Sequence, residues 1–235
     1  MKRIFRYLPL LLACASAIPY AAAQSTFDFN IGFGALQDKA ATMGTDNTTL
    51  NNCTIGTPSN PVTGEACVST PSLSGFMLGF GGNLMLWKHF GVGAEVSIQP
   101  AKQNYLALPV FAGEGLTSDE IQSRVTFYDF NGIFQPVKSK KAALDISGGI
   151  GGANIKFYEN QSASTALLGN QSQSQFAGSS NHFQVHGGVG VQIYLTDHFF
   201  VRPQFDIHYV PNLTQWGTKV VTQEMVWVGY SFGGQ

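Results

Sequence analysis

Apolar and polar residues alternate along most of the chain with a period of two. In the segment 26–34 every second residue is apolar and mostly aromatic, whereas the residues between them are Asp28, Asn30 and glycines. Successive side chains of a β-strand point to opposite faces, so this pattern predicts a strand with one apolar and one polar face. Such a strand suits a sheet whose two faces meet different surroundings.

Eight segments share this alternation, and each is long enough to cross a membrane as a tilted strand. The predicted strands cover residues 26–36, 74–87, 90–105, 121–135, 142–158, 182–195, 199–210 and 219–232. We expect a β-bulge at Pro203, because proline cannot donate a hydrogen bond to the neighbouring strand.

The connections between these segments alternate in length. Short turns follow the second, fourth and sixth segments, and longer connections cover approximately residues 37–73, 106–120, 159–181 and 211–218. Outer-membrane barrels have short periplasmic turns and long extracellular loops. The sequence therefore predicts an all-β fold, an eight-stranded antiparallel up-and-down transmembrane β-barrel with short periplasmic turns and long extracellular loops.

Composition favours the membrane barrel over a soluble one. Charged residues make up 11% of the 235-residue chain, compared with about 25% in ordinary soluble domains. A soluble lipocalin-like barrel has the same strand number, but its outer face would need more lysine and glutamate. The net charge of −1 gives no electrostatic reason to expect nucleic acid binding.

The first 23 residues have the layout of a cleaved signal peptide. Lys2, Arg3 and Arg6 precede a short apolar run, and small residues at 21–23 place the mature start at Gln24. The barrel domain is then 24–235. A rival interpretation takes 11–14 as a lipobox and makes Cys14 a lipidated first residue.

Cys53 and Cys67 lie within the first long connection. In an exported protein, two cysteines in a polar loop most simply form one disulfide. We expect no metal site there, because no histidine lies near them.

The polar faces would enclose a set of ionisable residues inside the barrel. The predicted interior network consists of Asp28, Glu95, Asp129, Asp145, His186, Arg202, Asp206 and His208. An eight-stranded barrel is just wide enough for side chains to fill it, which favours a hydrogen-bonded packed interior. Because five carboxylates face one arginine, a narrow wet lumen that passes small cations remains the alternative.

The sequence contains no motif of a known catalytic or cofactor site. GxSxG, HExxH and CxxC are absent, and the glycines at 148–152 precede neither a lysine nor a helix pattern. A hydrolase or acyltransferase would need a serine–histidine–acid set near the outer rim. We therefore expect no catalytic residue, no cofactor and no metal.

The last predicted strand ends in the aromatic sequence WVGYSF at residues 227–232. With TFDFNIGFGA at 26–35 and FFVRPQFDIHYV at 199–210, it resembles the eight-stranded OmpA/OmpX-like outer-membrane β-barrel superfamily. The resemblance implies a cell outer membrane location and an assembly signal, formed by Trp227, Tyr230 and Phe232, for the barrel-assembly machinery.

The resemblance leaves the activity open. We expect a non-enzymatic structural or surface-interaction role for a monomer that contacts outer-membrane lipids and, through its loops, an extracellular partner. A narrow porin-like channel for small cations or small, including hydrophobic, solutes is the alternative.

Overall fold

The computed structural model describes residues 26–38, 74–108, 116–165, 169–212 and 218–233. These residues form strands and turns. The strands are β1 (Thr26–Gln37), β2 (Gly75–Met85), β3 (Phe90–Ile98), β4 (Gln103–Leu108), β5 (Leu116–Lys138), β6 (Ala142–Thr165), β7 (Gly169–Tyr194), β8 (Phe199–Tyr209) and β9 (Val220–Phe232). No helix in this part of the chain is long and apolar enough to span a membrane.

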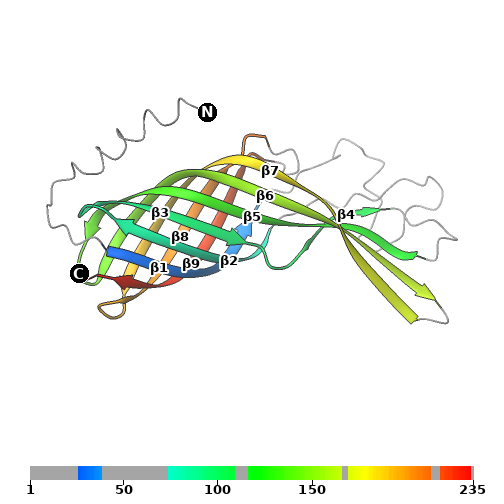
Figure 1. The fold of residues 1–235 in the computed structure, drawn as a ribbon, viewed down its shortest axis with the longest axis horizontal. Coiled ribbons are helices and arrows are strands. Elements are labelled where there is room, and N and C mark those ends of the chain that lie inside the picture. Colours follow the sequence, from blue (N-terminus) through cyan, green and yellow to red (C-terminus); the bar gives the residue numbers. More distant parts are fainter. Residues whose placement is uncertain (1–25, 39–73, 109–115, 166–168, 213–217, 234–235) are drawn as a thin grey trace, which may run out of the picture.

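The strands close into an antiparallel ring (Figure 1). β1 pairs with both β2 and β9, and β3 pairs with β5 to complete the circle. Because β4 also pairs with β5, β3 and β4 occupy one position, and the described strands fill eight positions. The predicted eight-stranded antiparallel up-and-down barrel is confirmed.

The pairings also fix the tilt of the strands. Phe27 pairs with a residue on the next strand, that residue pairs with one on the strand after it, and so on around the ring. The residues on this path are Leu84, Val92, Gly132, Gly148, Gly187, Ile207, Thr222 and finally Gln37. The path returns to β1 ten residues beyond its start. A stagger of this size tilts eight strands by about 40° from the barrel axis and leaves an interior that side chains can fill.

The apolar face of the sheet points outward. Phe27, Phe29, Ile31 and Phe33 are 45%, 46%, 47% and 49% exposed, while Asp28 and Asn30 between them are 2% and 0% exposed. The same alternation continues in the other strands, with Phe130 and Val189 outside and Asp129 inside. This is the predicted membrane-barrel orientation, and it is the reverse of a soluble barrel with an apolar core.

The predicted strand lengths need correction on one side of the ring. The segment 159–181, predicted as a loop, mostly belongs to β6 and β7, which pair out to Thr165 and Gly169 with one register shift between Phe157 and Tyr158. β5 likewise begins at Leu116 inside the predicted loop 106–120. These strands project beyond the end of the barrel (Figure 1). Their pairing needs no buried apolar face, so the alternation that identifies the barrel strands is missing from them.

The third predicted strand, 90–105, is interrupted. β3 ends at Ile98 and β4 begins at Gln103, with Pro100 between them. Proline lacks the N–H that a strand ladder uses, which explains the break.

The bulge predicted at Pro203 is wrong. Arg202, Pro203 and Gln204 pair in unbroken register with Trp227, Val226 and Met225. On the other edge the register is the same before and after the proline, from Gly190 opposite Gln204 to Ile193 opposite Val201. The strand therefore passes through Pro203 without an extra residue.

Several sequence predictions concern residues outside the described ranges. They are the signal peptide at 1–23, the lipidation of Cys14 and the disulfide between Cys53 and Cys67. These stay predictions.

Candidate functional site

The inward-facing polar side chains form the first candidate site. All eight predicted interior residues are buried, with exposed fractions from 2% for Asp28, Arg202 and His208 to 8% for Glu95. They come from β1, β3, β5, β6, β7 and β8, because the alternation directs every second residue of each strand into the lumen.

Arg202 of β8 joins two carboxylates from other strands, Glu95 of β3 across the ring and Asp145 of β6. Its Nη2 donates to Glu95 Oε1 at 2.8 Å, and its Nη1 donates to Asp145 Oδ2 at 3.5 Å. The guanidinium also lies over the ring of Trp227, at 5.6 Å from the ring to Cζ. A buried charge is stable only when it is paired, so one arginine compensates two of the five lumenal carboxylates.

The two histidines form a second group. His186 Nε2 donates to Asp206 Oδ1 at 2.9 Å, and its Nδ1 lies 3.0 Å from Asn131 Oδ1. The His186 and His208 rings stack with centroids 4.9 Å apart, and His208 Nε2 lies 3.0 Å from Gln223 Oε1.

Amide side chains donate hydrogen bonds to the three remaining carboxylates and to Asp145, while Asp28 Oδ1 has no partner among the described residues. Gln184 donates to Asp129 at 2.6 Å, Gln135 donates to Asp145 at 2.8 Å and Gln192 donates to Asp28 at 3.2 Å. Gln204 donates to both oxygens of Asp206. The predicted network names only ionisable residues, but the same period-two alternation places Gln184, Gln192 and Gln204 on the polar, inward-facing sides of their strands.

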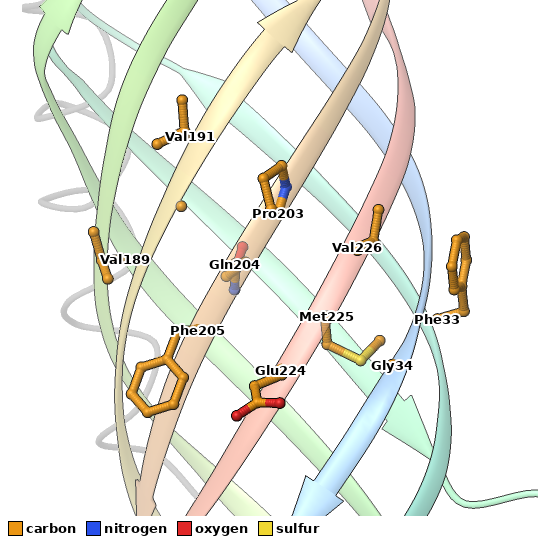
Figure 2. A pocket seen from close by; sticks show the side chains of 11 residues that line it. Phe33, Gly34, Val189, Val191, Pro203, Gln204, Phe205, Glu224, Met225 and Val226 are labelled. Carbon is orange, nitrogen blue, oxygen red and sulfur yellow. The ribbon is translucent and has the colours of Figure 1, made fainter.

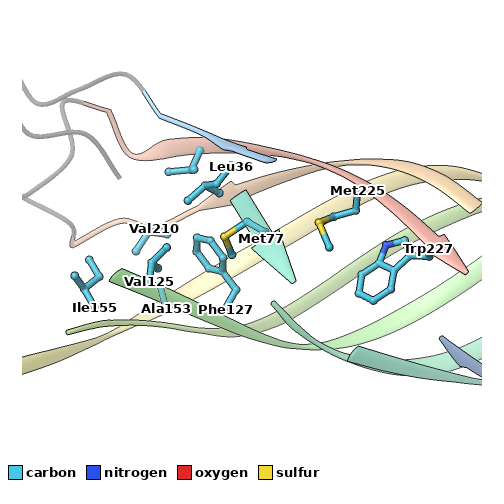
Figure 3. Close-up of a cluster of buried hydrophobic side chains, with 10 residues drawn as sticks. Leu36, Met77, Val125, Phe127, Ala153, Ile155, Val210, Met225 and Trp227 are labelled. Carbon is cyan, nitrogen blue, oxygen red and sulfur yellow. The ribbon is translucent and has the colours of Figure 1, made fainter. Parts of the chain in front are cut away.

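An apolar layer covers the polar network at the end of the barrel from which β5, β6 and β7 project. Its buried side chains include Leu36, Met77, Val125, Phe127, Ala153, Ile155, Val210 and Val221. Figure 3 shows these side chains together, with Met225 and Trp227 farther along β9. Phe127 stacks on His208 with centroids 4.4 Å apart, so the apolar layer directly contacts the polar one.

A second set of apolar side chains lies at the opposite end. Met85, Ile133, Ala143 and Phe200 are buried near the strand ends that the short turns join. The polar network therefore lies between two apolar layers. Single buried polar side chains accompany the layers, namely Gln99 beside Val125 at one end and Thr26 beside Met85 at the other.

Trp227 fills the lumen beside the arginine. It is 1% exposed, and a Cβ on Gly79 or Gly32 would lie only 2.4 Å or 2.6 Å from its ring. Because Gly32 of β1 and Gly79 of β2 have no side chain, the indole ring occupies the space beside their backbone. Of the predicted assembly signal, Trp227 lies inside, whereas Phe232 is on the outside and packs against Tyr230 at 4.7 Å.

The projecting strands form a second candidate site. Phe176 is 55% exposed, and the residues from Gly169 to Ala177 are exposed throughout. At the base, Tyr158 contacts Lys102 Nζ at 4.1 Å and Phe176 at 5.8 Å, and Lys102 donates to Ser174 at 2.6 Å. These contacts join the β3–β4 connection to β6 and β7 and fix the projection on the barrel.

Tyr105 of β4 belongs to the same base. It packs edge-on against Phe157 with ring centroids 5.2 Å apart. Partial burial raises the pKa of its phenol, so the group stays neutral well above neutral pH.

A shallow groove of about 550 Å³ crosses the outer face of the barrel over β7, β8, β9 and β1 (Figure 2). Phe33, Val191, Pro203, Phe205 and Val226 line it, together with the carboxylate of Glu224. Gln37 Nε2 donates to Glu224 Oε2 at 3.2 Å. The groove is open and mostly apolar, as expected of a surface that lipid chains cover.

Among the described residues no group of three histidine, cysteine or acidic side chains could hold a metal ion. His182 lies near Ser180, with 2.9 Å between Nε2 and Oγ. The described contacts of this pair include no carboxylate, so they do not assemble a serine–histidine–acid set.

Comparison with known proteins settles the family. The profile described as outer membrane protein beta-barrel domain matches residues 8–232. The chain belongs to this family. Membership indicates an outer-membrane location. In outer-membrane barrels the short turns generally face the periplasm and the long connections face the cell exterior, which would put the projecting strands outside. Members of this family of small barrels are generally non-enzymatic.

Solved structures of similar barrels are distant in sequence. A major outer membrane protein from Thermus thermophilus has 12% identity and a TM-score of 0.49, covering 88% of this chain and 99% of that one. The attachment invasion locus protein Ail of Yersinia pestis, in complex with a heparin analogue, has 13% identity and a TM-score of 0.47, covering 89% and 99%. OprG from Pseudomonas aeruginosa has 15% identity and a TM-score of 0.40, covering 89% and 96%. No curated protein matches the sequence.

Proposed function

We propose that this outer-membrane barrel is a non-enzymatic surface protein whose projecting β5–β7 sheet contacts a macromolecular partner outside the cell. The observation that carries the proposal is the contrast between the two candidate sites. The inward-facing side chains of the lumen are buried, and Arg202 and His186 bind lumenal carboxylates between apolar layers. The projecting strands instead expose their side chains on a fixed support.

Electrostatics supports the same division of roles. The β7 segment 169–182 contains no charged residue and is rich in glutamine, serine and asparagine. Such side chains can both donate and accept hydrogen bonds, so the strand presents many neutral polar contacts to a partner.

The test places a photoreactive amino acid at Ser172 and, as a matched control, at Ile146 on the lipid-facing surface. On intact cells we expect discrete high-mass adducts from position 172 and only lipid adducts from position 146. Replacing 159–175 by an Asn-Gly turn should leave a folded barrel, because Tyr158 and Phe176 already face each other. Lack of any adduct at 172 would contradict the proposal.

A narrow cation channel is the second candidate, and the acidic lumen favours it. Five carboxylates share the interior with one arginine, so a wet lumen would attract cations. Neutralising Glu95 or Asp206 separates the two functions: a pore changes its ion permeation, whereas a packed interior only loses stability.

A further inference from the structure

Four lysines gather on two neighbouring turns at the end of the barrel opposite the projecting strands. Lys88 lies in the β2–β3 turn, and Lys138, Lys140 and Lys141 lie at the β5–β6 turn. The β2–β3 turn contacts β5 just before the β5–β6 turn: Gln135 N donates to the His89 carbonyl at 2.8 Å, and His89 Nδ1 donates to the Gln135 carbonyl at 2.6 Å. We call these four lysines the basic rim.

The lysines of the basic rim are available to a partner. Lys88, Lys140 and Lys141 are exposed, Lys138 is half-buried, and no ion pair within the described residues involves them. The adjoining β7–β8 turn contributes one acidic residue, Asp197. The basic rim is therefore strongly positive on a chain whose net charge is −1.

Large apolar side chains border the basic rim on the outer face. Trp87 is 58% exposed and Val137 is 62% exposed, next to Lys88 and Lys138. Phe90 and Phe134 stack on the outer face with centroids 4.9 Å apart. Tryptophan and other aromatic residues mark the membrane–water boundary, so the ammonium groups lie at the level of the lipid headgroups.

We propose that the basic rim binds the phosphates of anionic phospholipids in the inner leaflet of the outer membrane. The leaflet follows from the family rule that the short turns face the periplasm. Clustered lysines beside a bilayer attract anionic headgroups. Here the two hydrogen bonds between His89 and Gln135 hold the β2–β3 turn against the end of β5 that leads into the other lysines. The turns are too short to carry these charges away from the bilayer, which favours lipid over the cell wall as the partner. The surface proposed for extracellular contacts plays no part in this site.

Trp87 provides a probe within the site. Trp227 is buried inside the barrel and shielded from lipid. Trp216 lies outside the described residues, so the experiment uses a variant in which phenylalanine replaces it. The W216F protein is refolded into phosphatidylcholine vesicles in which a minority lipid is brominated. The brominated lipid is phosphatidylglycerol in one sample and phosphatidylcholine in the other, at equal content. Bromine quenches tryptophan fluorescence on contact. The ratio of the quenching by brominated phosphatidylglycerol to that by brominated phosphatidylcholine therefore reports how far phosphatidylglycerol is enriched beside Trp87.

We expect brominated phosphatidylglycerol to quench Trp87 about twofold more strongly at low salt, and high salt to remove the difference. The K88Q/K138Q/K140Q/K141Q variant should lose the difference, whereas the control K156Q/K219Q, with substitutions toward the opposite end, should keep it. Heat-dependent gel mobility verifies folding, and K140Q/K141Q serves if the fourfold variant does not fold. Equal quenching by the two lipids overturns the proposal. A quenching difference that survives in folded variants lacking the basic-rim lysines also overturns it. Binding of soluble peptidoglycan fragments without lipid enrichment also overturns it.

Discussion

At the residue scale, Arg202 organises the charges of the lumen. Its guanidinium contacts Glu95 and Asp145 and lies over Trp227. A carboxylate inside the barrel lowers the stability of the fold unless a cation or hydrogen-bond donor faces it. Arg202 therefore stabilises the barrel by compensating the two buried negative charges.

Replacing Arg202 should therefore be costly. The R202M variant leaves Glu95 and Asp145 without their cation, and we expect the free energy of unfolding in lipid vesicles to fall by about 3–5 kcal/mol. Adding E95Q and D145N should recover a large part of the loss, because the uncompensated charges disappear. Urea titrations followed by tryptophan fluorescence measure both effects. An R202M barrel as stable as the parent would refute the compensation.

Glycine positions in the lumen are fixed by the side chains opposite them. A Cβ on Gly79 would lie 2.4 Å from the Trp227 ring, whereas a Cβ on Gly178 would meet nothing within 4 Å. The alternation in the sequence places Gly79 on the inward face of its strand, where the missing side chain leaves space. It does not reveal that an indole from β9 fills that space, because the contact joins residues far apart in the chain.

The G79A substitution should destabilise the barrel by about 1–3 kcal/mol, since the indole must move within a packed interior. G178A, in the open part of β7, is the matched control and should change stability little. The same urea titrations compare the two variants. Equal stabilities would show that the interior around Trp227 is loosely packed.

At the element scale, alternation predicts strands only where the two faces differ. The eight barrel strands have an apolar and a polar face, and their positions follow from sequence to within a few residues, apart from the interruption near Pro100. The projecting parts of β6 and β7 carry glutamine, serine and asparagine on both faces. Their strand structure comes from backbone pairing alone, so the sequence suggested a loop.

The orientation of these elements can be measured on intact cells. In a C53S/C67S background, a membrane-impermeant maleimide should label S172C in the projecting β7 strand. The same reagent should label K140C in the β5–β6 turn only after the outer membrane is permeabilised. Labelling of K140C on intact cells, with S172C protected, would reverse the assigned topology.

At the scale of the whole molecule, the closed ring and its stagger decide what the lumen can hold. Eight strand positions with a ten-residue offset give an interior that side chains fill. Strand number, closure and the inward direction of the charged residues could be predicted from the sequence. The apolar layers above and below the network could not, because they assemble from single residues on different strands, such as Val125, Ile155 and Val210.

Single-channel conductance of the refolded protein in a planar bilayer tests the central claim, a lumen closed by packed side chains. Heat-dependent gel mobility first establishes that the barrel has folded. We predict that the folded protein stays electrically silent and that E95Q or D206N changes its stability without opening a current. Stable cation-preferring steps in the parent protein, reduced by either substitution, would contradict the packed lumen and establish the pore.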